Sequence, residues 1–345
     1  MNLKELVRHN IWNLEPYSSA RSEFTGNASV FLDANENPFN MPYNRYPDPL
    51  QTKVKELIAE IRHIPAENIF LGVGSDECID LAYRIFCRPG IDNVVAMAPT
   101  YGMYQVCADI NDVEYRRVAL ADDFSLDIEA MLAAANNKTK LMWICSPNNP
   151  TGNAFSLDTL SELCRRFHGI VIVDEAYIDF SRQGSMLKHL SELPNLIVFQ
   201  TLSKAWGSAA VRLGIAFASK EIIDIYSKVK YPYNVSDLTQ RYAIDRLSRS
   251  DEVAEWVNTL LENRKALIDK LSELDCVKHI YPTDANFVLV RVDDADALYS
   301  HLRSHGIIVR NRNRVEKCLG CLRITVGTCN ENNQLINAML KYEKR

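Results

Sequence analysis

The sequence predicts an α/β protein with a large domain, in which helices cover both faces of a parallel sheet, and a smaller α+β domain. Three observations support this prediction. The chain has 345 residues, and at roughly 150 residues per domain it has room for about two domains. Short, nearly continuous apolar runs alternate with helical patterns up to residue 250, as expected for parallel strands that are buried on both faces. Beyond that point long amphipathic patterns alternate with single strands.

The expected elements of the large domain can be placed in order. Residues 1–10 predict a short amphipathic helix. Residues 50–61 predict a second helix, because apolar side chains recur on one face and Asp48 with Pro49 suits its start. Apolar runs predict strands at 69–73, 94–98, 141–145, 170–173, 196–199 and 213–218. Helical patterns lie between them at 79–86 and 157–167.

The smaller domain is predicted over residues 251–345. A charged amphipathic helix begins at Asp251, followed by a strand at 286–292, a helix at 295–305 and a strand at 322–326. Residues 46–250 then form the large domain, and residues 226–235 approach its boundary. Residues 1–45 have many turn formers and few long apolar runs, which predicts an arm that lies on another surface or joins the small domain.

Composition and charge exclude several classes of protein. Hydrophobic residues make up 47% of the chain and charged residues 24%, so neither a disordered nor a fibrous protein is expected. The 39 basic and 44 acidic residues give a net charge of −5, which argues against a nucleic-acid partner. Nine scattered cysteines fit a reducing cytoplasm. No apolar run approaches the roughly 20 residues that span a bilayer, so no membrane partner is expected.

Polar residues follow five of the apolar runs at the point where each predicted strand ends. In an open parallel sheet, ligands bind outside the carboxyl ends of the strands. The five segments are 72–77, 99–102, 146–152, 174–177 and 201–204. Gly72 and Gly74 form a turn that feeds a helix N-terminus, where free backbone N–H groups favour a phosphate.

Asp174 and Lys204 point to a cofactor when they are considered together. Each residue alone is more simply a paired carboxylate or a surface amine. At adjacent strand ends, beside a phosphate-binding turn and Arg212, an acid and an amine are the groups that a pyridoxal phosphate site needs. The amine bonds to the aldehyde, the carboxylate keeps the ring nitrogen protonated, and fixed donors hold the phosphate. The residues therefore predict pyridoxal 5'-phosphate as the cofactor.

The motifs around these residues resemble those of a known family. Residues 146–152 (Ser-Pro-Asn-Asn-Pro-Thr-Gly), 174–177 (Asp-Glu-Ala-Tyr) and 201–205 (Thr-Leu-Ser-Lys-Ala), with Arg212, resemble the fold-type I aminotransferases in order and spacing. Segments 33–38, 44–47, 99–104 and 321–328 resemble the histidinol-phosphate aminotransferases within that group. The resemblance spans about residues 17–328. It implies a fold-type I pyridoxal-phosphate transferase with a mixed, mostly parallel sheet, and a symmetric homodimer.

The resemblance also implies a role for individual residues around the cofactor. Lys204 would carry the cofactor and later move a proton between it and the substrate carbon, while Asp174 would pair with the ring nitrogen. Tyr177 and Asn149 would hold the phenolic oxygen, and Tyr101 would stack on the ring. The groups implied for the phosphate are the backbones of Ser75 and Asp76, and the residues Thr201, Ser203 and Arg212, with Tyr46 from the other subunit.

A further set of residues is implied for the substrate. They are Arg323, Arg310 and Tyr17 for its anionic end and Asn35, Glu36 and Asn37 for its imidazole. A guanidinium binds a carboxylate or a phosphate monoester bidentately, so one pocket can accept glutamate and histidinol phosphate in turn. The implied reaction is a ping-pong transfer of an amino group between glutamate and imidazole-acetol phosphate, in histidine biosynthesis.

Other functions fit parts of the sequence. An aromatic or broad-range aminotransferase and a threonine-phosphate decarboxylase share the fold, which alone does not separate them. A nicotinamide-dependent dehydrogenase would use the glycine turn, but Glu77 stands where a third glycine is needed. A non-catalytic regulator of the same fold would need an added DNA-binding segment, and none fits before residue 45. Cys318 and Cys321 have metal-ligand spacing but lack a second pair, so no metal is expected.

Overall fold

The computed structural model describes residues 2–17 and 29–344, and its larger sheet has seven strands. Their order is β1-β7-β6-β5-β4-β2-β3. The bounds are β1 Ile69–Val73, β2 Asn93–Ala98, β3 Glu114–Ala119, β4 Thr139–Cys145, β5 Ile170–Asp174, β6 Leu196–Thr201 and β7 Leu213–Phe217. β7 pairs antiparallel with β1 and β6, and the other neighbouring strands are parallel. The prediction of a mixed, mostly parallel sheet is confirmed.

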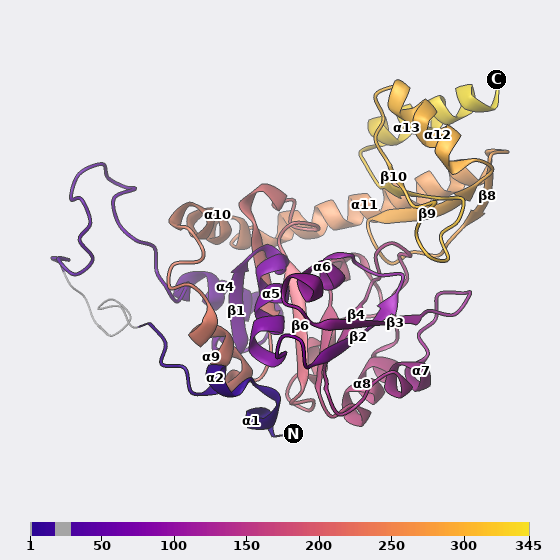
Figure 1. Cartoon of the computed structure of the whole chain (residues 1–345). Coiled ribbons are helices and arrows are strands. Elements are labelled where there is room, and N and C mark those ends of the chain that lie inside the picture. Colours follow the sequence, from indigo (N-terminus) through magenta and orange to yellow (C-terminus); the bar gives the residue numbers. More distant parts are fainter. Residues whose placement is uncertain (1, 18–28, 345) are drawn as a thin grey trace.

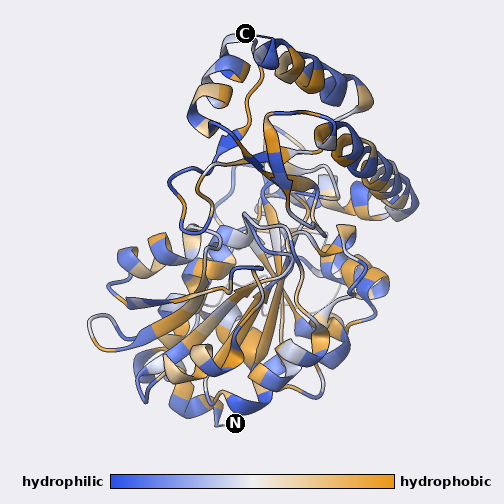
Figure 2. Cartoon of the chain, turned by 90° about the vertical axis from the view of Figure 1, so that its right-hand side faces the viewer, coloured by the Kyte–Doolittle hydropathy of each residue, from blue (hydrophilic) through white to orange (hydrophobic). Residues whose placement is uncertain are grey.

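The strands predicted in the large domain are those in which nearly every position is buried. β2, β5, β6 and β7 are buried at every position, and helices flank the sheet on either side of its hydrophobic strands (Figure 2). β3 was not predicted, because it lies at the edge of the sheet and its sequence Glu-Tyr-Arg-Arg-Val-Ala mixes charged and apolar residues. The largest buried side chains include Trp143, Tyr83 and Tyr104, which stack on one another in the core.

Several helices pack around this sheet. The α-helices before residue 250 are α1 Leu3–Leu6, α2 His9–Trp12, α4 Thr52–Arg62, α5 Gly74–Phe86, α6 Met103–Ile110, α7 Ile128–Ala133, α8 Leu157–Arg166, α9 Lys220–Val229 and α10 Asp237–Leu247. Short 3-10 turns occupy Ala66–Asn68, Ile178–Phe180, Met186–His189 and Ala209–Val211. α5 contacts β1, β6 and β7, while α6 contacts β3 and α8 contacts β5.

Two predicted helices near the N-terminus differ from the structure. The helix expected over 1–10 is split into α1 and α2, because Val7 is buried with an extended backbone and Arg8 N–H donates to Ile85 O at 2.9 Å. A tertiary contact therefore overrides the local helical pattern. α4 begins at Thr52, whose N–H donates to the Asp48 carboxylate at 2.6 Å, so Pro49 precedes the first turn.

A second, antiparallel sheet follows after residue 250. Its order is β10-β11-β9-β8, with β8 Val277–Ile280, β9 Phe287–Val292, β10 Arg310–Asn311 and β11 Cys321–Thr325. Three helices accompany it, α11 Ser250–Ser272, α12 Ala295–Ser304 and α13 Cys329–Glu343. α11 runs from the large sheet to the small one (Figure 1), and the small sheet has a hydrophobic cluster of its own. The exact boundaries after residues 45 and 250 stay a prediction.

Residues 29–48 form neither helix nor strand and extend away from the body of the chain (Figure 1). Their exposed apolar side chains include Val30, Leu32, Phe39 and Met41, which are 69%, 90%, 76% and 80% exposed. None of the helices in the described part of the chain has the length and apolar character needed to cross a bilayer.

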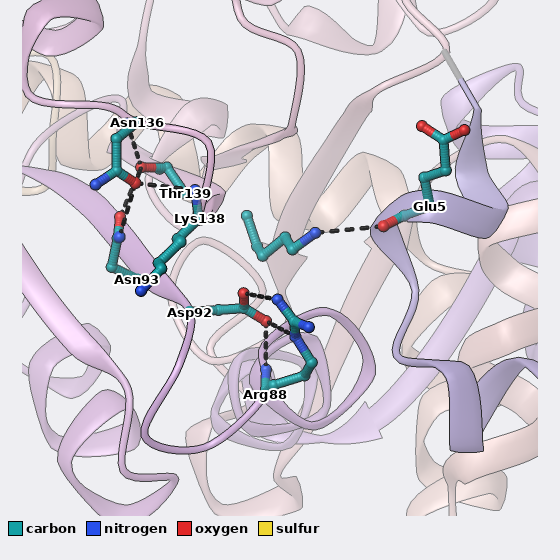
Figure 3. A network of polar contacts seen from close by, with 8 residues as sticks. Glu5, Arg88, Asp92, Asn93, Asn136, Lys138 and Thr139 are labelled. Atoms are coloured by element: carbon teal, nitrogen blue, oxygen red, sulfur yellow. Dashed lines mark hydrogen bonds and ion pairs between the residues drawn. The ribbon is translucent and has the colours of Figure 1, made fainter.

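At the amino ends of the parallel strands, polar side chains form hydrogen bonds with one another (Figure 3). Asp92 accepts two hydrogen bonds from the Arg88 guanidinium, at 2.9 and 2.7 Å, and Thr139 donates to Asn93 at 2.6 Å. A hollow of about 580 Å³ beside it is lined by both signs of charge and so favours no single charged ligand. The carboxyl ends of the strands differ from these amino ends, because polar groups there face a cavity.

Candidate active site

A cavity of about 710 Å³ lies where the carboxyl ends of β2, β4, β5 and β6 meet the first turn of α5. β5 and β6 are neighbours, so their ends bring Asp174 and Lys204 to the same cavity. β7 runs in the opposite direction, and Arg212 therefore enters the cavity from just before its first residue. The predicted residues that line the cavity are Ser75, Asp76, Tyr101, Asn149, Asp174, Tyr177, Thr201, Ser203, Lys204, Arg212, Arg310 and Arg323.

Five predicted residues do not line this cavity. They are Tyr17, Asn35, Glu36, Asn37 and Tyr46, which lie on or before the projecting segment 29–48. The Tyr46 ring stacks on Tyr233 with centroids 4.5 Å apart, and its backbone N–H donates to Glu36 at 2.6 Å. Tyr17 is 75% exposed. Within one chain these residues therefore do not complete the cavity.

Asp174 is buried at the floor of the cavity, where it is 3% exposed. The Tyr104 hydroxyl donates to its Oδ2 at 2.6 Å, and the Ala176 N–H donates to its Oδ1 at 3.1 Å. Burial raises the pKa of Asp174, while these two hydrogen bonds and the charge of Lys204 oppose that rise. Sequence reasoning missed Tyr104, although its place three residues after Tyr101, at a helix start, was a usable signal.

Lys204 lies in the loop after β6, with its side chain in the open mouth of the cavity. Its Nζ is 5.6 Å from the centre of the Tyr177 ring. Loss of solvation and then the charge of Arg323 lower the pKa of Lys204. A lowered pKa raises the fraction of neutral amine, which is the nucleophilic form.

The start of α5 offers a phosphate subsite. Gly74 has a φ of +70°, and a Cβ there would lie 2.5 Å from an Arg212 nitrogen, so the tight turn favours glycine. Asp76 contacts Arg212 at 3.2 Å and accepts from the Tyr101 hydroxyl at 3.3 Å. Ser75 in the first turn of this 13-residue helix adds free N–H groups. With the hydroxyls of Thr201 and Ser203, these donors fit the phosphate of the predicted cofactor.

The opposite end of the cavity belongs to the small sheet. Arg310 of β10 lies directly across from Arg323 of β11. Arg323 donates to the Asn149 side-chain oxygen, and the Asn149 amide donates to the Tyr177 hydroxyl at 3.4 Å. Burial and the nearby Arg310 lower the pKa of Arg323. This end of the cavity therefore carries positive charge, which favours an anion.

Arg312 also lines the cavity and was missed by sequence reasoning. The signal was the alternation Arg310-Asn311-Arg312, since residues i and i+2 of a strand share a face.

The comparisons with known proteins establish the family. Residues 29–339 match the model of aminotransferase class I and II. The chain is 56% identical over 338 residues to a histidinol-phosphate aminotransferase of Parabacteroides distasonis, covering 98% of each chain. It is 55% identical over 342 residues to one of Bacteroides thetaiotaomicron, covering 99% of each. The chain therefore belongs to the class I and II aminotransferases, and within them to the group that contains these histidinol-phosphate aminotransferases.

Solved structures agree on the fold. A histidinol-phosphate aminotransferase from Clostridium acetobutylicum superimposes with a TM-score of 0.81 at 21% identity, covering 88% of this chain and 91% of that one. One from Sinorhizobium meliloti, in complex with pyridoxal 5'-phosphate, has a TM-score of 0.81 at 23% identity, covering 87% and 83%. The family depends on pyridoxal phosphate, so the cofactor predicted from Asp174 and Lys204 is confirmed.

Proposed function

We propose that the protein transfers an amino group between glutamate and imidazole-acetol phosphate, as a histidinol-phosphate aminotransferase of histidine biosynthesis. One observation carries the proposal. A single cavity holds the carboxylate of Asp174 at its floor, the amine of Lys204 at its mouth and a cluster of arginines at the end formed by the small sheet. The names of relatives that are 46% to 56% identical support the same substrates.

The cofactor and the protein have separate tasks. Bound pyridoxal phosphate supplies an electron sink for the bond that breaks at the amino-bearing carbon. Asp174, oriented by Tyr104 and the Ala176 N–H, presents the negative charge that keeps a proton on the ring nitrogen. Tyr177 and Asn149, which are joined by a hydrogen bond of 3.4 Å, would hold the phenolic oxygen. The groups proposed to hold the phosphate are the backbone N–H groups of Ser75 and Asp76, with Thr201, Ser203 and Arg212, and Tyr101 would pack on the ring.

Lys204 has two tasks in this proposal. Its amine would hold the cofactor, and afterwards it would move a proton at the amino-bearing carbon of the substrate. Its lowered pKa supports both tasks, because a neutral amine can act as a nucleophile and as a base near neutral pH.

The arginine end of the cavity holds the two substrates in turn. Arg323, with Arg310 beside it, binds a carboxylate of glutamate or the phosphate of histidinol phosphate. Both anions match the two parallel N–H groups of a guanidinium. Asn149 fixes the direction of Arg323 by accepting one of its N–H groups.

We also propose a homodimer in the cytoplasm, in which the arm of one protomer completes the cavity of its partner. The exposed apolar side chains of residues 29–48 support a second copy as the occupant, since large exposed apolar surfaces mark interaction sites. Tyr46 would then reach the cofactor phosphate, while Tyr17, Asn35, Glu36 and Asn37 would face the substrate. The nine cysteines are all free thiols, which supports a reducing compartment.

A product assay tests the proposed substrates. The purified holoenzyme is incubated with histidinol phosphate and 2-oxoglutarate, and we expect glutamate and imidazole-acetol phosphate in equal amounts. Turnover confined to phenylalanine or tyrosine would assign an aromatic aminotransferase instead. Release of carbon dioxide from threonine phosphate, without amino transfer, would assign a decarboxylase.

A further inference from the structure

The small-sheet end of the cavity carries more positive charge than a carboxylate needs. Arg310, Arg312 and Arg323 all line it. No carboxylate in residues 2–17 and 29–344 forms an ion pair with any of the three. Burial, then Arg323 and Arg310, lower the pKa of Arg312 to about 10, so it stays charged at neutral pH. Three guanidiniums that repel one another favour an anion with more than one charge.

The backbone holds Arg312 toward the cavity. Arg312 N–H donates to Cys321 O at 2.9 Å, which continues the pairing of β10 with β11 by one residue. Asn311 and Asn313 bind the two carboxylate oxygens of Asp296 in α12, at 2.5 and 2.9 Å. Because side chains alternate along an extended strand, tying the asparagines to α12 turns the intervening arginine to the other face. Arg312 is thus positioned by its neighbours.

The hydrogen bonds of Arg312 are incomplete. The Nε atoms of Arg312 and Arg323 are both buried without a hydrogen-bond partner. A buried donor without a partner is destabilising, and a ligand oxygen can satisfy it. A carboxylate brings two oxygens and one charge, whereas a phosphate monoester brings three terminal oxygens and a charge of about −1.5 to −2 at pH 7. The third terminal oxygen and the extra charge of the phosphate give a third guanidinium a partner that a carboxylate lacks.

We infer that Arg312 is a specificity residue that binds the phosphate of the substrate and contributes little to glutamate binding. This inference rests on the proposed function, in which both substrates use the same cavity. Arg323 and Arg310 serve both anions, and Arg312 adds the donors that distinguish a dianion from a carboxylate.

The two half-reactions of the holoenzyme provide the test. In Arg312→Gln, the apparent affinity for histidinol phosphate should fall about tenfold or more, which corresponds to about 1.4 kcal/mol. The apparent affinity for glutamate should change less than about threefold, since glutamate offers no third oxygen at that end. Arg314→Gln is the matched control, because Arg314 belongs to the same segment but is exposed and does not line the cavity. It should leave both affinities unchanged.

A conservative variant, Arg312→Lys, keeps the test possible if Arg312→Gln does not fold. If Arg312→Gln is not folded by circular dichroism, the same comparison uses Arg312→Lys. Lysine keeps the charge but lacks the planar pair of donors, so the loss should again be confined to the phosphate substrate. Equal losses for glutamate and histidinol phosphate, in either variant, would overturn the inference.

Inorganic phosphate separates this inference from the proposed function. Its binding to the holoenzyme, in which the cofactor phosphate fills the other anion subsite, is measured by calorimetric titration. Binding should weaken about tenfold in Arg312→Gln and stay unchanged in Arg314→Gln, as expected for a lost charge-assisted contact. Phosphate binding that is absent in the wild type, or unchanged in Arg312→Gln, would overturn the inference. A wild type that binds phosphate through Arg312 but does not transaminate histidinol phosphate would refute the proposed function alone.

Discussion

Burial is the main influence on the pKa of the Asp174 carboxyl group, and the hydrogen bond from Tyr104 opposes its effect. Desolvation raises the pKa of Asp174, while the Tyr104 hydroxyl stabilises the charged form through a 2.6 Å hydrogen bond. The proposed role of Asp174 needs that charged form. Activity should therefore fall as the pH decreases through the pKa of this carboxyl group.

Tyr104→Phe tests this balance at the residue scale. Removing the hydroxyl raises the pKa of Asp174 further, so the acid limb of the kcat profile should move to higher pH. A hydrogen bond to a charged group contributes about 1.5 to 3 kcal/mol, which is about one to two pH units. The measurement is kcat against pH for the holoenzyme.

The matched control for this variant is Tyr83→Phe. Tyr83 is equally buried and also stacks on Trp143, but its hydroxyl donates to the Tyr104 carbonyl and not to Asp174. Its acid limb should stay in place. Identical pH profiles for Tyr104→Phe and the wild type would show that the hydroxyl does not tune Asp174.

At the scale of elements, the turn from β1 into α5 depends on Gly74. Alanine there combines a φ of +70° with a Cβ 2.5 Å from an Arg212 nitrogen. Gly74→Ala should displace Arg212, weaken cofactor binding and lower the free energy of unfolding by about 1 to 3 kcal/mol. Gly102→Ala is the control, because a Cβ at Gly102 meets nothing within 4 Å. Cofactor titration and urea unfolding of both variants check this, and equal results would contradict the role of the turn.

Strands could be predicted from the sequence where most of their side chains are buried. The six strands predicted in the large domain were visible because nearly all of their positions are buried and their sequences are almost continuously apolar. β3 and β8 lack that signal, since their burial is partial. α5 begins five residues before the predicted start, because its first turn is the polar, ligand-facing segment that begins at Gly74.

The site was predictable to the extent that parallel strands bring their carboxyl ends together. That rule placed Asp174 and Lys204 correctly in one cavity. Tyr104 and Arg312 were not predicted. The contact of Tyr104 depends on how α6 packs against the sheet, and that of Arg312 depends on the register of β10. Tyr46 and the other arm residues lie outside the cavity of their own chain, and their assignment stays a prediction about a second copy.

For the whole molecule, the projecting arm predicts that each cavity is built from two chains. Hybrid dimers of Lys204→Ala and Tyr46→Ala subunits test this directly. If Tyr46 acts across the interface, the hybrid has one intact site, because the chain with Lys204 receives Tyr46 from its partner. Mixing the two weakly active or inactive variants after partial denaturation should therefore restore activity.

The control is a mixture of Lys204→Ala with Asp174→Ala subunits. Both residues belong to the same chain's cavity. In each hybrid, one cavity therefore lacks Lys204 and the other lacks Asp174. No hybrid has an intact site, and no activity should return. Failure of the Tyr46 mixture to regain more activity than this control would contradict a shared cavity.

The central claim is that Lys204 carries the cofactor opposite Asp174. Borohydride reduction of the holoenzyme, followed by proteolysis and mass spectrometry, measures this attachment directly. The account predicts a pyridoxyl-phosphate adduct on the peptide that contains Lys204. An adduct on another lysine, or a preparation that takes up no cofactor, would contradict it.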